Sequence, residues 1–290
     1  MIIIADKFGQ LGNRLLVFAH FIACAIEHKF EVMNPSFGGY SEYFKTTTED
    51  FFCRYPQTKS LLKGGRTLRS LFYRFVALST RTIIKAKIKC RFLDTITLDP
   101  GSSLHLSDKT FLDLARRTRI LIVRGWEFRD QANFEKHADA IREFFTPVEP
   151  LQRNIGALMR EATKDCDVIV GVHIRHGDYR VYADGKYFYN TDQYANIMEK
   201  VENLFSGNKV GFLICSDEKQ DEAKFSKFRF NFGNGHIVGD MYSFAQCNYL
   251  IGAPSTYTMW ASFYGGVPLY MIEDPAAAVS FESFRVWAKI

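Results

Sequence analysis

Paired cysteines and long apolar runs are both missing from this chain of 290 residues. Its six cysteines stand singly with no C-x-x-C spacing, which argues against a zinc site or a disulfide framework and favours reduced thiols. The start, MIIIADKFGQ, lacks the charged and long apolar stretches of a signal peptide. The most apolar helix candidate, RLLVFAHFIACAIEH, is shorter than the roughly 20 residues that span a bilayer. We therefore expect a cytoplasmic protein, and its composition, 47% hydrophobic and 24% charged, is typical of globular chains.

Two nucleotide-binding fingerprints are also absent. The first glycine-containing loop, FGQLGN, is not G-x-G-x-x-G, and it lacks the Lys-Ser/Thr ending of a P-loop. This argues against hydride transfer and against ATP hydrolysis. Gly9, Gly12 and Asn13 can still form a tight turn whose backbone approaches a ligand. No metal is expected, because no carboxylate or His/Cys cluster has metal-ligand spacing.

Acidic residues are absent from residues 51–93, which carry eleven Lys and Arg interleaved with leucine, isoleucine and phenylalanine. One interpretation is a surface segment that contacts anionic lipid headgroups or a phosphorylated carrier lipid, at the inner face of a membrane. The other is a helical lobe whose basic face is simply solvated. Nucleic acid is not expected as a partner, because the segment has no recognised reading motif.

The order of apolar runs predicts an α/β protein with two lobes. The first, residues 1–148, opens strand–loop–helix–strand with its helix starting at Arg14, and it contains the basic segment as a helical insertion. ANFEKHADAIREFF predicts a helix, and TPVEP at 146–150 then interrupts the chain with two prolines, so we place the second domain at 149–290. There, apolar strands (VIVGVHI, VGFLICS, HIVG, YLIGA, VPLYMI) alternate with helices such as EKQDEAKFSKF and STYTMWASFY. Asn190, with Gln193 three residues on, predicts a capping-box-like start for another helix. This alternation is typical of a parallel sheet covered on both faces.

Polar residues gather where these strands end. The strand VIVGVHI leads into His173 and Arg175, which face the same way because side chains alternate along a strand. Two later strands are followed by Asp217 and by Ser255 and Thr256, which open a helix. Each residue alone is more often a cap or a structural strand end. Together they suit a diphosphate and a purine base, since ligands bind beyond the carboxyl ends of such strands.

At this point the chain resembles a known family. GVHIRHGDY resembles the H-x-R-R-G-D-Y motif of α1,2-fucosyltransferases, which are related more distantly to α1,6- and protein O-fucosyltransferases. FGQLGNRL is similar to the family's N-terminal loop, and FLICSDE and DMYSFAQCNYLIGAPSTYTMWASF are similar to its second and third motifs. The resemblance implies two Rossmann-like lobes facing a cleft (the GT-B type), an inverting transfer, GDP-fucose as donor and no metal or other cofactor.

The resemblance also implies roles for single residues. Arg175 would hold the β-phosphate, His173 the guanosine part of the nucleotide, and Asp217 the guanine. Ser255 and Thr256 would bind phosphate oxygens. Gly12 and Asn13 would face the diphosphate or fucose from the other lobe.

Transfer without a metal is chemically consistent with these residues. The breaking bond leaves negative charge on the diphosphate, which Arg175 and a helix N-terminus can stabilise. The acceptor hydroxyl needs a base or an orienting acceptor, for which Asp178 and Glu127 are candidates, although Asp178 can instead hold the turn after the strand. The family's second arginine is His176 here. If that position touches the donor, donor affinity or identity can differ, and if it is a structural ion-pair position the change is tolerable.

Three functions stay open. The first is an active fucosyltransferase, with transfer α1,2 to galactose expected. The second is a transferase of a related GDP-deoxysugar such as colitose, and the third is a non-catalytic glycan- or nucleotide-binding module. The expected acceptor is a glycan or a lipid-linked oligosaccharide, whose identity the sequence does not specify.

Overall fold

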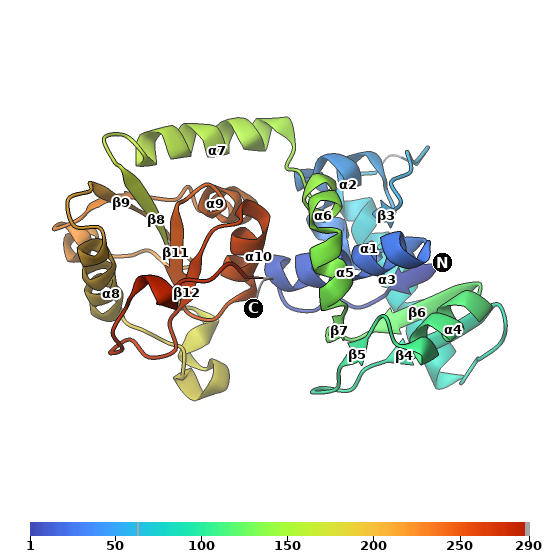
Figure 1. Ribbon diagram of the computed structural model, residues 1–290. Helices are drawn as coiled ribbons and strands as arrows, with labels where there is room; N and C mark the ends of the chain where they lie inside the picture. Colours follow the sequence, from blue (N-terminus) through green and yellow to red (C-terminus); the bar gives the residue numbers. More distant parts are fainter. Residues whose placement is uncertain (63, 288–290) are drawn as a thin grey trace. The chain divides into compact units, whose positions relative to one another are not determined.

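The computed structural model of the chain describes residues 1–62 and 64–287. The chain forms two compact units that divide between Glu149 and Pro150, and each contains a five-stranded sheet (Figure 1). The predicted α/β class is confirmed. Among the described residues, no helix is both long enough and apolar enough to cross a bilayer.

The first unit is built on a sheet with strand order β3-β2-β1-β6-β4. All neighbours are parallel except β2 and β3, which are antiparallel. Its strands are β1 (Ile2–Ile4), β2 (Val32–Met33), β3 (Arg54–Tyr55), β4 (Leu93–Thr97) and β6 (Ile120–Arg124), with β5 (Leu104–His105) and β7 (Phe128–Arg129) paired separately. Its helices are α1 (Leu11–His28), α2 (Lys45–Glu49), α3 (Arg66–Lys85), α4 (Lys109–Arg117), α5 (Gln131–Lys136) and α6 (Ala138–Phe144).

Helix α3, which lies within the basic segment, covers one face of this sheet. Val76 and Ile83 of α3 pack against Ile3, Ala5 and Ile122 of the strand layer. The segment therefore supplies β3, α3 and the start of β4, and it belongs to the sheet's own fold. This differs from the insertion predicted from the sequence, because some apolar residues of the segment pack against the sheet while others are exposed.

The second unit contains a fully parallel sheet with strand order β10-β9-β8-β11-β12. Its strands are β8 (Val168–Ile174), β9 (Val210–Ser216), β10 (Arg229–Phe232), β11 (Tyr249–Gly252) and β12 (Leu269–Met271). Its helices are α7 (Glu149–Ala162), α8 (Thr191–Leu204), α9 (Ile237–Phe244) and α10 (Thr256–Gly265). The predicted parallel C-terminal sheet is confirmed.

The two faces of β8 explain its apolar sequence. Val170, Val172 and Ile174 belong to the core that α8 completes through Tyr194, Ile197, Met198 and Val201. The alternate residues, Gly171 and His173, point to the other face, toward Phe244 of α9. A side chain at Gly171 would place its Cβ 2.6 Å from the Phe244 ring and from Leu250, so only glycine fits there.

Several local predictions were wrong. HIVG is not a strand, because the His236 imidazole accepts the Gly239 N–H and starts α9. The strand beside β9 is RFNF instead. EKQDEAKFSKF gives only a short 3-10 helix, since Phe225 and Phe228 both turn into the core. The helix predicted over ANFEKHADAIREFF breaks at His137 into α5 and α6. In contrast, the predicted capping box of Asn190 and Gln193 is present in both directions.

Candidate functional site

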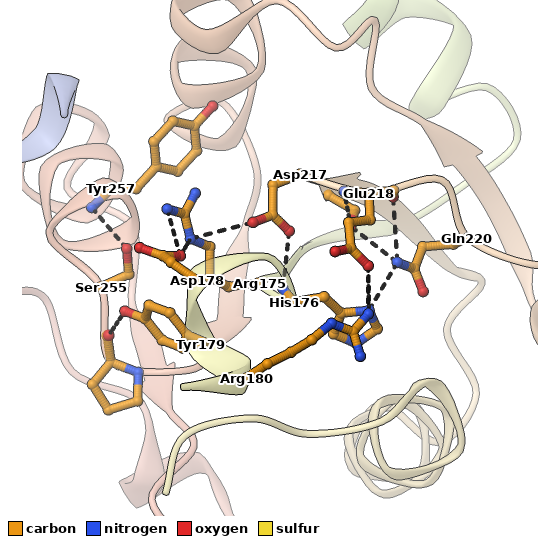
Figure 2. Close-up of polar contacts among 12 residues, drawn as sticks. Arg175, His176, Asp178, Tyr179, Arg180, Asp217, Glu218, Gln220, Ser255 and Tyr257 are labelled. Carbon is orange, nitrogen blue, oxygen red and sulfur yellow. Dashed lines mark hydrogen bonds and ion pairs between the residues drawn. The ribbon is translucent and has the colours of Figure 1, made fainter. Parts of the chain in front are cut away.

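Arg175 follows β8 and is held between two carboxylates (Figure 2). Its Nε and Nη2 each lie 2.8 Å from Oδ1 of Asp178, and Nε lies 3.4 Å from Oδ2 of Asp217. Among the described residues, the other terminal nitrogen, Nη1, has no hydrogen-bond partner. The side chain is one-fifth exposed. The guanidinium is therefore fixed in direction and still has donors for a ligand.

The segment after Arg175 is tied to the start of α10. The Tyr179 hydroxyl donates a hydrogen bond to the Pro254 carbonyl, one residue before Ser255. Ser255 is the N-cap of α10, and its Oγ accepts the Tyr257 N–H at 3.2 Å. A helix N-terminus carries partial positive charge and unpaired N–H groups. The segment that carries Arg175 is therefore tied to the residue before the N-cap of α10, and a helix N-terminus of this kind can bind an anion.

His173 lies behind this surface and not on it. Its ring stacks on Tyr257 with centroids 4.8 Å apart, and the residue is only 5% exposed. Its Nδ1 is buried and has no hydrogen-bond partner among the described residues. Burial, and Arg175 nearby, lower the pKa of His173 to about 4, against an opposing effect of Asp217. The imidazole is neutral at neutral pH and supports the layer under Tyr257.

This burial predicts a pH-dependent stability. The unfolded chain binds a proton at His173 below about pH 6.5, whereas the folded chain does so only below about pH 4. Stability should therefore fall as the pH drops through this window, by up to about 1.4 kcal/mol per pH unit for this one proton. His173→Asn should remove that share of the slope in urea unfolding followed by circular dichroism. The buried His20, whose pKa is also lowered, should contribute the same pH dependence to the unmodified protein and to the variant. An identical slope in the variant would contradict the assignment.

Asp217, after β9, fastens the turn that follows β8. Its Oδ1 accepts the His176 N–H at 2.9 Å, while Oδ2 faces Arg175. A side chain at Gly177 would place its Cβ 2.7 Å from Oδ2, so glycine allows the close approach of the turn. The carboxylate thus has a positioning role in addition to the predicted contact with a base.

A cavity of about 440 Å³ lies beyond the carboxyl ends of β9 and β10. It is lined by the strand ends and the loop that follows β10, including Ser216, Asp217, Glu218, Phe232, Gly233 and Asp240. Asp240 accepts the N–H groups of Asn234 and Gly235 and so shapes this loop. Burial raises the pKa of the Asp240 carboxyl. Asp217 belongs both to the cavity and to the Arg175 ion pair, so the two features are continuous.

His176, which replaces the family's second arginine, points away from Arg175. It is buried, its Nε2 lies 2.9 Å from the Tyr189 carbonyl, and its Nδ1 lies 3.3 Å from the Gln220 amide (Figure 2). The Phe188 ring packs on it, with centroids 5.0 Å apart. Of the two alternatives for this position, the structure favours the structural one.

We expect His176→Arg to change stability more than activity. A longer, charged side chain must be placed in a buried position, and overpacking of this kind costs about 1–3 kcal/mol. Urea unfolding should show this loss, while turnover in the absence of urea stays within a few-fold of that of the unmodified protein. His105→Arg, at an exposed position of β5, is the matched control. A large loss of turnover at unchanged stability would mean that this position touches the donor.

The remaining predicted residues lie in the first unit. Gly12 and Asn13 are in the first turn of α1, which begins at Leu11 and so earlier than the predicted Arg14. The tight turn before it is made by Gly9, whose φ is +52°. Asn13 lines a small cavity at the end of β1, whereas Gly12 is buried. Glu127 is about one-third exposed and pairs with Arg129 at 3.2 Å.

One group of residues has the composition of a metal site. Cys24 and His28, one turn apart on α1, lie with Asp130 so that one ligand atom of each is within 4.8 Å of the others. Sequence spacing could not show this, because Asp130 comes from a distant segment. Its carboxylate already accepts hydrogen bonds from Ser107 and Asn133, and burial raises the pKa of the Cys24 thiol to about 12. The group is in the first unit and has no residue in common with the Arg175 site.

Some contributors were missed from the sequence. Tyr257 was expected only as part of a helix, and Asp240 only as part of a family motif. Arg180 pairs with Glu218 at the rim of the cavity. Their roles depend on contacts between segments far apart in the chain, and the polar residues at the strand ends and the family motifs pointed only to the region in which they lie.

Comparison with known proteins gives one family and several structural relatives. A model described as glycosyl transferase family 11 matches residues 124–285, which is more than half of the chain. The α-1,2-colitosyltransferase of Escherichia coli is 22% identical over 292 residues, covering 90% of this chain and 87% of that protein. The matched region contains all of the predicted site residues except Gly12 and Asn13.

Solved structures share the fold at low sequence identity. A mutant of Arabidopsis thaliana FUT1 in complex with GDP has a TM-score of 0.60 at 14% identity, covering 98% of this chain and 73% of that one. NodZ α-1,6-fucosyltransferase of Bradyrhizobium, soaked with GDP-fucose, has a TM-score of 0.56 at 15% identity, covering 95% and 97%. POFUT1 in complex with GDP has a TM-score of 0.51 at 10% identity, covering 91% and 93%. The chain therefore has the GT-B fold of these structures.

Proposed function

Since the chain belongs to glycosyl transferase family 11, we propose that it is an inverting transferase that moves L-fucose from GDP-fucose to a hydroxyl of a glycan, α1,2 to galactose. The observation that carries the proposal is Arg175, fixed by two carboxylates next to the capped N-terminus of α10. The relatives solved with GDP or GDP-fucose support the choice of donor.

In the proposed complex the diphosphate lies between Arg175 and the start of α10. Arg175 binds the β-phosphate, and Ser255 and Thr256 bind phosphate oxygens. The guanine enters the cavity after β9 and β10, where Asp217 accepts the amino and imino hydrogens of the base. His173 supports the guanosine part from below through Tyr257.

The reaction is a single displacement. The acceptor oxygen forms a bond to C1 of fucose while the bond from C1 to the β-phosphate oxygen breaks, and GDP leaves with the bonding electron pair. Negative charge grows on the diphosphate, where Arg175 and the helix N-terminus are already oriented to stabilise it. This arrangement requires no metal in the proposed mechanism, so the rate should be unchanged in EDTA.

The acceptor's proton must pass to a base. Asp178 and Glu127 remain the candidates, each already paired with an arginine. Asp178 is more than half exposed and its pairing also orients Arg175, so we assign it both functions. For Gly12 and Asn13 we propose the role that the family resemblance implies, which is contact with the diphosphate or fucose. A glycan or a lipid-linked oligosaccharide in the cytoplasm is the proposed acceptor.

Another GDP-deoxysugar is the second candidate donor, because the Escherichia coli relative is an α-1,2-colitosyltransferase. Thermal unfolding with added nucleotide tests the donor class. GDP and GDP-fucose should raise the melting temperature, whereas ADP, UDP and NAD should not, since ligand stabilisation grows with the logarithm of concentration over Kd. Competition between GDP-fucose and GDP-colitose for transfer then identifies the sugar. Equal stabilisation by UDP would overturn the donor assignment.

A further inference from the structure

Helix α3 exposes a row of large apolar side chains to solvent. Of the twelve exposed large hydrophobic residues among the described residues, eight lie between residues 61 and 92. Four of them follow each other on α3 at spacings of three and four, which places them on one side of the helix. They form what we call the outer stripe, and their exposed fractions are 43, 54, 67 and 66% for Leu68, Leu71, Phe75 and Leu78 respectively.

Exposed cations accompany the outer stripe. Arg74, Arg81 and Lys85 follow each other at spacings of seven and four, so they run along one edge of the stripe. Three more exposed cations follow the helix within six residues of its end: Lys87, Lys89 and Arg91. No Asp or Glu occurs in residues 51–93 to neutralise them.

Arg69 is one of the eleven cations of residues 51–93 but does not belong to this surface. It is buried, and its guanidinium donates hydrogen bonds to backbone carbonyls of the segment before α3, including those of Thr47, Asp50 and Phe51. Its charge anchors the helix to the unit. Lys63, another of the eleven basic residues of this segment, lies outside the described residues.

We propose that the outer stripe of α3 binds the surface of a membrane that contains anionic lipid. The apolar side chains enter the boundary between headgroups and acyl chains, and Arg74, Arg81 and Lys85 contact the phosphates. Apolar residues edged by arginine and lysine, without acidic residues, are typical of helices that lie in this interface. A second copy of the chain fits the surface poorly, because it would bring the same positive charges together. This inference does not depend on the reaction or on the donor.

Flotation of the purified full-length protein with vesicles tests the proposal. The protein should bind vesicles of phosphatidylcholine with phosphatidylglycerol, bind phosphatidylcholine alone weakly, and dissociate as salt is raised. Each basic residue near an anionic surface contributes about fivefold to affinity, so replacing Arg74, Arg81 and Lys85 together with Gln should weaken binding on the order of 100-fold. Phe75→Ser should weaken binding to the same vesicles without lowering the melting temperature, because the side chain is exposed.

A control removes three exposed charges from α4 and the residues after it, in the same unit: Lys109→Gln, Arg117→Gln and Arg119→Gln. This variant should bind nearly as well as the unmodified protein. The proposal is overturned if the unmodified protein does not bind vesicles, or if the α3 variants bind as well as the control. It is also overturned if Phe75→Ser instead separates a dimer in sedimentation, which would make the stripe an interface between copies. None of these outcomes bears on the donor, which the nucleotide screen tests separately.

Discussion

Arg175→Lys should lower the transfer rate on the order of 100- to 1000-fold, even though it keeps the positive charge. The guanidinium is a planar fork of donors that can engage two phosphate oxygens while Asp178 and Asp217 hold its direction, and an ammonium group cannot reproduce this. Arg175→Ala should lose at least as much. The fold should survive both changes, because Arg175 lies at the end of β8 and is not part of the unit's apolar core.

The measurement is the rate of GDP release from GDP-fucose with acceptor present, together with circular dichroism of each variant. Arg160→Lys, on an exposed position of α7, is the matched control and should be fully active. If folded Arg175→Ala kept near-normal transfer, Arg175 would have no role in stabilising the leaving diphosphate.

The second large effect is expected at Asp217, where two roles can be separated. If Asp217 accepts hydrogens from guanine, Asp217→Ala should weaken GDP binding about 10- to 150-fold, the range typical of a hydrogen bond to a charged group. Asp217→Asn keeps an oxygen that can accept the His176 N–H but loses the charge that faces Arg175. This variant should therefore retain the fold and still discriminate poorly between GDP and nucleotides with other bases. Calorimetric titration with GDP measures the affinity of both variants.

Titration with IDP, whose base lacks the amino group, distinguishes base recognition from positioning. The unmodified protein should bind GDP more tightly than IDP, and this difference should vanish in Asp217→Ala. A variant that loses affinity for both nucleotides equally would show that Asp217 only holds the turn and Arg175. Glu161→Gln, an exposed position on α7, controls for the change in net charge.

The sequence was most informative where one local signal determines the structure. The apolar strands β8 and β9 and the Asn190 capping box follow from short-range patterns, and all three are present. The strand ends then lie at one edge of the sheet because parallel strands run the same way, so Arg175, Asp217 and Ser255 could be grouped before the structure was known.

The sequence was least informative where contacts between distant segments decide. His173 was expected to face a ligand with Arg175, yet it is covered by Tyr257 of α10. Asp217 looked like a free polar residue, yet it accepts a backbone N–H from the turn after β8. Arg69 had the pattern of a surface cation and is instead buried by the segment before α3. In each case the side chain contacts a residue far away in the sequence in place of solvent. A local sequence pattern cannot predict such a contact.

Release of GDP from GDP-fucose by the purified protein, followed across a panel of glycan acceptors with EDTA present, tests the central claim most directly. The proposed function predicts acceptor-dependent release of GDP, a fucosylated product with inverted configuration at C1, and no release of nucleotide from UDP-sugars. The account would be contradicted if the protein bound GDP-fucose as tightly as it binds GDP and yet released no GDP with any acceptor or donor sugar. It would then be a binding module and not a transferase.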